Sequence, residues 1–213
     1  MEVWLTLCIQ EGCGMKNPIH VGLNKLSKLY YKILTKFYIK RVDIIIDIGC
    51  GTRPQTFFVP YIHNCIDPYK PYIDAIANST IDTLDRIWIF NQGDWVKSIE
   101  IMKSGNINSV FLLDVIEHLD KDESLKLLKE TEKLVSDQII VYTPYGYFDQ
   151  VECDGKDAWG MDGVEFQKHK SGWYPEDFGE GWKVWVLPYA HIVNSMNEPI
   201  KPSSAILAIY NKR

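Results

Sequence analysis

Between residues 43 and 143, strand-like runs alternate with polar stretches of helical composition, and this alternation constrains the fold more than any other feature. The runs rich in β-branched and aromatic residues cover 43–48, 63–67, 86–91, 109–114 and 138–143. Strands separated by helices form parallel sheets with helices on both faces. The pattern of strand then helix, repeated five times, therefore predicts an α/β domain with a doubly wound, mostly parallel sheet.

The end of the chain completes the predicted fold. Residues 118–136 carry apolar side chains on one side and acids near their start, which is typical of a helix. Strand-like runs at about 183–188 and 204–210 leave no room for a long helix between them. We expect these two strands to pair antiparallel at one edge of the sheet. The chain then divides into an N-terminal segment, residues 1–41, and one domain, residues 42–213.

Acidic residues stand at or just after the carboxyl ends of four successive predicted strands: Asp47, Asp67, Asp94 and Asp114. Ligands of open α/β sheets bind at this edge. Burying four carboxylates in a core would be costly. A shared polar site at the carboxyl edge is therefore the simpler explanation.

A glycine turn follows the first of these strands, in the stretch "VDIIIDIGCGTRPQ". Gly49 and Gly51 let the backbone turn tightly and approach a ligand closely. Asp67 follows Asp47 by 20 residues, at the spacing where an acid accepts hydrogen bonds from a ribose diol. These residues together predict a ligand that contains a ribose.

The residues around the turn indicate which nucleoside binds. NAD places a pyrophosphate against a helix N-terminus, and a third glycine allows close packing there, but this chain has Arg53 and Pro54. The carboxylate of Asp47 would repel a pyrophosphate but could help to hold an ammonium group. The pattern therefore favours S-adenosylmethionine, which has a ribose and an ammonium group but no phosphate.

Over roughly residues 42–211 the chain resembles a class I S-adenosylmethionine-dependent methyltransferase. "VDIIIDIGCGT" resembles the glycine-rich first motif of that family, "NCIDPY" the second and "NQGDW" the third. "FLLDVIEHLDKDESLKLLKE" is similar to a segment of the small-molecule methyltransferases. "IIVYTPYG" and "SAILAIYNK" resemble the fifth strand and the antiparallel last strand. The departure is Arg53-Pro54, where many members carry another glycine.

The resemblance implies a Rossmann-like, seven-stranded sheet of order 3-2-1-4-5-7-6 with an antiparallel last strand. It implies that Asp67 binds the ribose, that Asp94 faces the adenine amino group near Trp95, and that Asp114 through His118 line the methionine side. The expected cofactor-binding residues are Asp47, Gly49, Cys50, Gly51, Asp67, Asp94, Trp95 and Asp114. Asp94 could instead cap a short helix, and Trp95 could be part of the core.

The implied function is S-adenosylmethionine-dependent methyl transfer to a small-molecule acceptor, by in-line attack on the sulfonium methyl group. A second hypothesis is a methyltransferase-like domain that binds the cofactor or regulates a partner without turnover. A third is an NAD-dependent oxidoreductase, against which the missing third glycine and the lack of a Tyr-x-x-x-Lys-type pair argue.

Residues 145–182 form a long insertion before the late strands, and we expect it to be the substrate-side cover. It is rich in glycine, aromatic residues and acids. The aromatic residues could attract a cationic acceptor, or they could form a small local core, which we favour. The candidate catalytic residues are His169 and His118, either of which could act as a general base if the acceptor carries a proton. Structural hydrogen bonding is the alternative for His169.

Residues 20–40 have the periodicity of an amphipathic helix. We expect its apolar side to pack on the domain; this side comprises Leu23, Leu26, Tyr30, Ile33 and Phe37. The lysines of the other face are Lys25, Lys28, Lys32, Lys36 and Lys40. We expect this face to be solvated, and the alternative is a contact with an anionic surface such as a membrane, an RNA or an acidic partner.

Composition limits the remaining possibilities. From residue 43 onward the chain has 16 basic and 26 acidic residues, a poor surface for phosphates, so we do not expect nucleic acid as a partner. The five cysteines are scattered without a C-x-x-C, which suits a reducing cytoplasm. The histidines do not cluster with these cysteines, so no metal site is expected. No apolar run reaches the roughly 20 residues of a membrane span.

Overall fold

The structure is a computed structural model that describes residues 25–80, 85–150, 155–193 and 199–212. The first half of the chain contains α1 (Lys25–Tyr38), β1 (Ile44–Ile48), β2 (Ile62–Asp67), α2 (Lys70–Thr80), β3 (Ile87–Gln92) and α3 (Trp95–Ser104). The second half contains β4 (Ser109–Leu113), the 3₁₀ turn η1 (Ile116–His118), α4 (Lys121–Leu134), β5 (Gln138–Pro144), α5 (Val164–Gln167), η2 (Pro175–Asp177), β6 (Trp182–Val193) and β7 (Pro199–Asn211).

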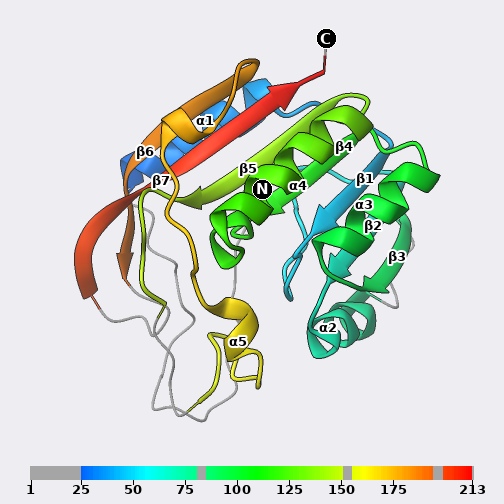
Figure 1. The fold of residues 1–213 in the computed structure, drawn as a ribbon, viewed down its shortest axis with the longest axis horizontal. Helices are drawn as coiled ribbons and strands as arrows, with labels where there is room; N and C mark the ends of the chain where they lie inside the picture. Colours follow the sequence, from blue (N-terminus) through cyan, green and yellow to red (C-terminus); the bar gives the residue numbers. More distant parts are fainter. Residues whose placement is uncertain (1–24, 81–84, 151–154, 194–198, 213) are drawn as a thin grey trace.

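The seven strands form one sheet in the order β3-β2-β1-β4-β5-β7-β6, which confirms the predicted topology (Figure 1). The first five strands are parallel, and β7 pairs antiparallel with both β5 and β6. Strands β1, β4 and β5 are buried almost throughout, because helices or loops cover both faces. This double burial explains why their sequences read as near-continuous apolar runs.

The two faces of the sheet are covered by different elements (Figure 1). Helices α3 and α4 pack on one face, where Ile46, Val110 and Ile139 belong to the largest core cluster. Helix α1 packs on the other face beside β6, and α2 covers the same face over β2 and β3. The carboxyl ends of the parallel strands remain uncovered by these helices.

The predicted helix after the first strand is not formed. Residues 49–61, between β1 and β2, contain turns and extended chain but no helix. Gly49 and Gly51 have left-handed backbone angles, and Pro54 lacks the N–H that a helix interior needs. Phe58, a buried residue of this segment, lies in the core cluster that also contains Ile45. The loop itself therefore packs on the face of the sheet that a helix was expected to cover.

Helix α1 presents a different face to the domain from the one predicted. The residues that pack inward are Ser27, Tyr31, Leu34 and Tyr38. The predicted apolar side is exposed instead: Leu26, Tyr30, Ile33 and Phe37 have 68, 38, 44 and 77 % of their surfaces accessible. Leu23 lies outside the described residues. The domain selects the first face because the Ser27 hydroxyl donates a hydrogen bond to the Pro188 carbonyl and because three larger side chains flank it.

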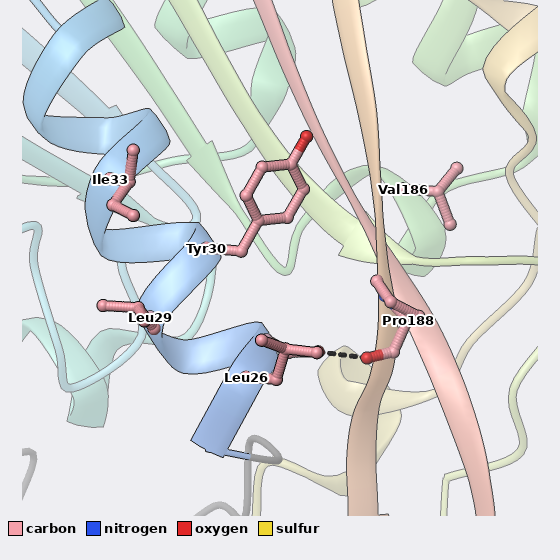
Figure 2. A pocket seen from close by; sticks show the side chains of 7 residues that line it. Leu26, Leu29, Tyr30, Ile33, Val186 and Pro188 are labelled. Atoms are coloured by element: carbon pink, nitrogen blue, oxygen red, sulfur yellow. Dashed lines mark hydrogen bonds between the residues drawn. The ribbon is translucent and has the colours of Figure 1, made fainter.

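An apolar groove lies between α1 and β6 as a result (Figure 2). Leu26, Leu29, Tyr30 and Ile33 line it from the helix, and Val186 and Pro188 line it from the strand. Within the part of the chain that the structure describes, no helix is both long and apolar enough to cross a membrane.

Candidate functional site

The glycine turn after β1 holds a backbone that other residues would strain. Gly49 and Gly51 have φ angles of 63° and 55°. The N–H groups of Gly49 and Cys50 both donate to the carbonyl of Ile66, at 2.7 and 3.2 Å. A Cβ atom on Gly49 would lie 2.9 Å from a methyl group of Val115. The turn therefore lies directly over the carboxyl end of β2, while the Cys50 side chain is buried beneath it.

Asp67, the last residue of β2, closes this turn. Its Oδ2 atom accepts a hydrogen bond from the N–H of Gly51 and its Oδ1 atom one from the N–H of Tyr69, each at 2.9 Å. The residue is 5 % exposed. Burial raises the pKa of Asp67 to about 6, although the two backbone hydrogen bonds oppose the rise. Each carboxylate oxygen has a second lone pair, so the group can still accept a hydrogen bond from a ligand.

Asp47 is engaged inside the protein, which revises the expectation that its carboxylate faces a ligand ammonium group. It is 1 % exposed, and its Oδ2 atom accepts a 2.6 Å hydrogen bond from the N–H of Gln55. The same atom lies 3.3 Å from Nε2 of His63, whose Nδ1 lies 3.3 Å from the Arg86 guanidinium. The direction of the Asp47 side chain follows from strand alternation, which turns it toward the face that Phe58 covers. Its role is to anchor the loop that replaces the missing helix.

The insertion of residues 145–182 reaches back over the glycine turn. A Cβ atom on Gly51 would lie 3.4 Å from the Trp159 ring, so this indole rests on the turn. Asp157 holds the loop in shape, because its Oδ1 accepts hydrogen bonds from the N–H groups of Trp159 and Met161, each at 2.9 Å. Its Oδ2 accepts a hydrogen bond from the Tyr72 hydroxyl of α2. The sequence pattern did not single out these contacts, since no local periodicity links α2 to the insertion.

The aromatic residues of the insertion divide into buried and exposed ones. Trp173 is fully buried and Phe178 nearly so, and both belong to the core cluster against α3 and α4. The exposed aromatic residues of the insertion are Tyr145, Tyr147, Phe166 and Tyr174. These two rings therefore join the main core of the domain and do not form the separate small core that was expected, and four other rings remain accessible.

Asp114 follows β4 with a left-handed φ of 54°, an angle that aspartate tolerates better than most residues. The residue is accessible to solvent, but the protein around its carboxyl group removes water from it, and this desolvation raises the pKa of Asp114 to about 7. The positive charge of Arg53 opposes the rise. Arg53 is half-buried, with its guanidinium carbon 5.9 Å from the centre of the Trp159 ring. Arg53 therefore lies over the site, next to the Trp159 ring.

Asp94 and Trp95 lie beyond β3 at the start of α3. Asp94 is exposed, and its Oδ1 caps the helix by accepting a 3.0 Å hydrogen bond from the N–H of Lys97. Trp95 is partly buried and packs against the core cluster, with the ammonium of Lys126 5.6 Å from its ring centre. The structural alternatives for both residues are thus present, and neither excludes a contact with a ligand.

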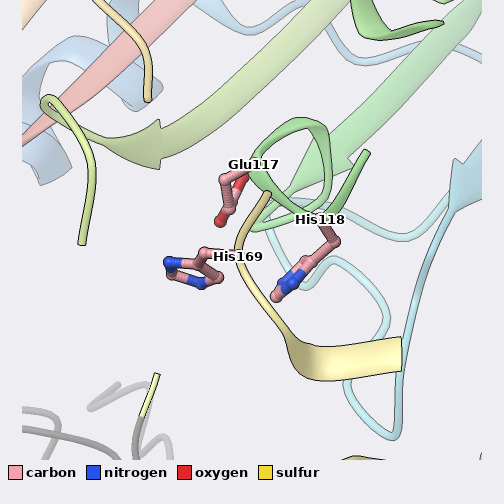
Figure 3. A group of neighbouring side chains, drawn as sticks. All are labelled: Glu117, His118 and His169. Atoms are coloured by element: carbon pink, nitrogen blue, oxygen red, sulfur yellow. The ribbon is translucent and has the colours of Figure 1, made fainter. Parts of the chain in front are cut away.

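Glu117, His118 and His169 lie close together (Figure 3). The predicted helix over 118–136 begins only at Lys121, and the first two of these residues belong to η1. Burial and the neighbouring His169 lower the pKa of His118 to about 4, and burial also lowers the pKa of His169. Both rings are therefore neutral near pH 7. The structure thus brings together the two histidines expected to be catalytic and Glu117, which belongs to the segment expected to line the methionine side.

The site as a whole lies at the carboxyl edge of the sheet and has two parts. One part, around Gly51 and Asp67, offers a tight backbone turn and a carboxylate. The other, around Asp114 and His169, offers acids, neutral imidazoles and the phenol of Tyr142, whose pKa is raised by burial and by Asp114. Such an arrangement can bind a nucleoside at one end and a second molecule at the other.

Comparisons with known proteins identify the fold. No protein-family model matches the sequence, and no curated protein matches it. Among solved structures, magnesium protoporphyrin IX methyltransferase from Synechocystis PCC 6803 with bound S-adenosylhomocysteine is similar, with a TM-score of 0.52 and 13 % identity over 89 % of this chain and 83 % of that chain. The YcgJ protein from Bacillus subtilis has a TM-score of 0.57 and 13 % identity, over 87 % and 99 % of the two chains.

A third similar structure is the N-terminal domain of EvdMO1 with S-adenosylhomocysteine bound, with a TM-score of 0.50 and 13 % identity over 90 % of this chain and 83 % of that chain. Together with the strand order, these similarities show that the protein has the fold of the class I S-adenosylmethionine-dependent methyltransferases. Its departure from the usual doubly wound arrangement is the loop that replaces the helix between β1 and β2.

Proposed function

We propose that the protein binds S-adenosylmethionine at the carboxyl edge of the sheet and transfers its methyl group to a small-molecule acceptor. The observation that carries this proposal is the left-handed turn at Gly49 and Gly51, closed onto the carboxylate of Asp67. A ribose diol above this turn would donate its hydrogen bonds to Asp67, as the resemblance implies. The bound S-adenosylhomocysteine in two structures of the same fold supports the choice of cofactor.

The loop between β1 and β2 argues against a dinucleotide. Binding of NAD in this type of fold uses the N-terminus of the helix after β1 to stabilise the pyrophosphate. Residues 49–61 contain no helix, so this positive dipole is absent there. The half-buried guanidinium of Arg53 is a suitable partner for the cofactor's α-carboxylate instead.

The remaining expected ligands have assigned places in this proposal. Asp94 and Trp95 flank the adenine end, beyond β3. Asp114 lies toward the methionine end, where its carboxylate, when ionised, attracts the ammonium group. Asp47 and Cys50 act indirectly, because their buried side chains support the turn. Methyl transfer then depends mainly on holding the acceptor in line with the sulfonium methyl group.

The insertion of residues 145–182 covers the acceptor in this proposal. Its accessible aromatic rings and the neighbouring Tyr142 can enclose a small organic molecule. If the acceptor loses a proton during attack, the neutral imidazoles of His118 and His169 are the groups placed to assist. The chain from residue 43 onward carries more acidic than basic residues and is a poor match for nucleic acid, which favours a small acceptor.

Isothermal titration calorimetry with S-adenosylhomocysteine tests the proposal directly. We expect binding by the full chain and a large loss of affinity for Asp67→Ala. Folded protein that does not bind S-adenosylhomocysteine would contradict the proposal, and a parallel titration with NAD checks the alternative cofactor. Binding without turnover on a broad panel of acceptors, together with a stable protein complex, would favour a regulatory domain.

We further propose that α1 contacts an anionic lipid surface. The observation that favours this contact is the exposed apolar side of α1, with Phe37 77 % accessible, next to a row of lysines on the same helix. A helix with apolar side chains beside lysines binds at the boundary of anionic membranes. The apolar groove between α1 and β6 extends this surface (Figure 2).

Vesicle sedimentation distinguishes a lipid contact from a solvated face. We expect the protein to sediment with phosphatidylserine-containing vesicles and not with neutral phosphatidylcholine vesicles. The double variant Leu29→Ser, Phe37→Ser should abolish sedimentation. Lys129→Glu, at an exposed position of α4, should not. Equal behaviour of the two variants would contradict this contact. We propose a cytoplasmic location, which the free thiols of Cys50 and Cys65 among the described residues would suit.

A further inference from the structure

Three groups that bind metal ions in other proteins converge beside the proposed acceptor site. Glu117 and His118 come from η1 after β4, and His169 comes from the insertion (Figure 3). One donor atom from each residue lies within 4.8 Å of the others. Methyl transfer by alignment alone does not require this convergence.

Glu117 is the least explained of the three residues. It is 2 % exposed, and its Oε2 atom accepts a 2.9 Å hydrogen bond from the Thr143 hydroxyl. Its Oε1 atom is buried and has no hydrogen-bond partner among the residues that the structure describes. An unpaired buried carboxylate oxygen is costly unless a cation or a donor occupies the position next to it.

The two histidines are oriented as metal ligands usually are. Nδ1 of His118 lies 3.3 Å from the carbonyl oxygen of Lys168, and Nδ1 of His169 hydrogen-bonds to the carbonyl oxygen of Phe148. A backbone carbonyl accepts only from a protonated nitrogen, so Nδ1 carries a proton in each ring and Nε2 is the nitrogen that can bind a metal. Hydrogen bonding of the second ring nitrogen to a carbonyl is the common support of a metal-bound histidine.

We propose that Glu117, His118 and His169 bind one divalent transition-metal ion of the zinc type. Two imidazole nitrogens and one carboxylate oxygen match the ligand set of open zinc sites, whereas magnesium and calcium prefer oxygen ligands alone. Three protein ligands leave at least one coordination position open. The sequence did not predict this site, because its histidines do not cluster with its cysteines and the site contains no cysteine.

We expect the methyl acceptor to take the open position, and this consequence rests on the proposed function, although metal binding itself does not. A hydroxyl group on the metal has a lowered pKa and releases its proton to solvent. Its oxygen then forms a bond to the methyl carbon as the carbon–sulfur bond breaks, and S-adenosylhomocysteine leaves. The inferred acceptor class is therefore a hydroxylated small molecule.

Metal binding is measured on the full chain after treatment with a chelator and its removal. Titration with Zn²⁺ should show one site per chain, and Co²⁺ should give the visible absorption bands of a bound tetrahedral or five-coordinate ion. Glu117→Gln and His169→Gln should each weaken Zn²⁺ binding by more than about a hundredfold, and Thr143→Val by about tenfold, as for an outer-shell partner. His191→Gln is the matched control, a neighbouring histidine outside the cluster, and it should bind normally.

Three outcomes would overturn the inference. One is folded wild-type protein that takes up no Zn²⁺ or Co²⁺. Another is an equal loss of affinity in His169→Gln and His191→Gln, which would indicate unspecific binding to histidines. The third is normal Zn²⁺ affinity in both His169→Gln and Glu117→Gln. Titration of S-adenosylhomocysteine in the same samples separates the two proposals. A protein that binds S-adenosylhomocysteine but takes up no Zn²⁺ or Co²⁺ would overturn only the metal site.

Discussion

The backbone N–H of Gly51 donates a 2.9 Å hydrogen bond to Oδ2 of Asp67, and this contact joins the turn after β1 to the end of β2. The hydrogen bond orients the carboxylate and the turn together, so a ligand that contacts one also meets the other. Side-chain variants of Asp67 therefore test the site and its architecture at once.

Asp67→Asn should weaken binding of S-adenosylhomocysteine by about 10–100-fold. Hydrogen bonds to a charged group contribute about 1.5–3 kcal/mol, and the amide replaces one acceptor oxygen by a donor. Isothermal titration calorimetry measures the change, and circular dichroism checks the fold. Asp74→Asn is the control, because Asp74 forms only an exposed pair with Lys70. Equal affinities of the two variants would argue against Asp67 as a ribose ligand.

The affinity for S-adenosylhomocysteine should depend on pH through the same carboxylate. The pKa of Asp67 in the free protein is raised to about 6, so the group is ionised above pH 6 and protonated below it. A ribose hydroxyl donates more strongly to the ionised form, so affinity should be highest above pH 6 and fall, by up to about tenfold per pH unit, below it. Calorimetry between pH 5 and pH 8 should give this profile. Asp67→Asn should lose the fall below pH 6 and keep only the pH dependence that Asp114 contributes, because the pKa of Asp114 is raised to about 7. An unchanged profile in this variant would contradict the assignment.

Gly49→Ala should destabilise the fold more than an alanine at another left-handed glycine. A left-handed backbone angle costs an alanine about 1–2 kcal/mol, and at Gly49 the new methyl group would also lie 2.9 Å from Val115. We expect a total loss of about 2–4 kcal/mol in the free energy of unfolding. Gly160→Ala is the control, because its φ is 73° but no atom lies within 4 Å of the added group. Urea unfolding of both variants measures the difference, and equal losses would contradict packing of the turn against Val115.

Lys121→Met should loosen the attachment of the insertion to α4. The Lys121 ammonium donates to the Gly172 carbonyl at 2.7 Å and to Asp177 at 2.5 Å, and it lies 3.6 Å from the centre of the Trp173 ring. Removing the ammonium takes the donor from the Gly172 carbonyl and leaves Oδ2 of Asp177 with only the N–H of Tyr174, so we expect a loss of about 1–3 kcal/mol in stability. Limited proteolysis should also cut within the insertion earlier.

The control for Lys121→Met is Lys129→Met, at an exposed position about two turns further along α4. It should change stability by less than about 0.5 kcal/mol, as most surface substitutions do. A comparable loss in both variants would mean that the contacts of Lys121 with the insertion contribute little.

Local sequence patterns predicted the sheet well but not the loop after β1. The strands could be read from β-branched runs, because burial on both faces demands apolar residues at every position. The prediction of a helix between β1 and β2 was wrong, because only the spacing between the two strands supported it. Pro54 and the nearby phenylalanines, which pack as a loop on the sheet, carried the contrary signal.

The face that a side chain occupies was the main source of error within correctly placed elements. Asp47 was correctly placed near the end of a strand, yet its side chain turns toward His63 and not toward the site. Helix α1 was predicted, but its larger apolar stripe is not the side that packs. In both cases the direction of the side chains depends on contacts with a residue further along the chain, His63 for Asp47 and Pro188 for α1.

The sequence by itself determined the order of strands and helices after Asp67, the glycine turn, and the acids that follow successive strands. These features depend on local periodicity and on the backbone conformations that glycine allows, and both can be read from residues that are adjacent in the sequence. Only the tertiary structure decided that Trp159 rests on the turn, that Asp47 is buried, and that His118 and His169 meet beside Glu117. Such contacts join segments far apart in the chain, and their geometry depends on how the whole sheet and its insertion pack.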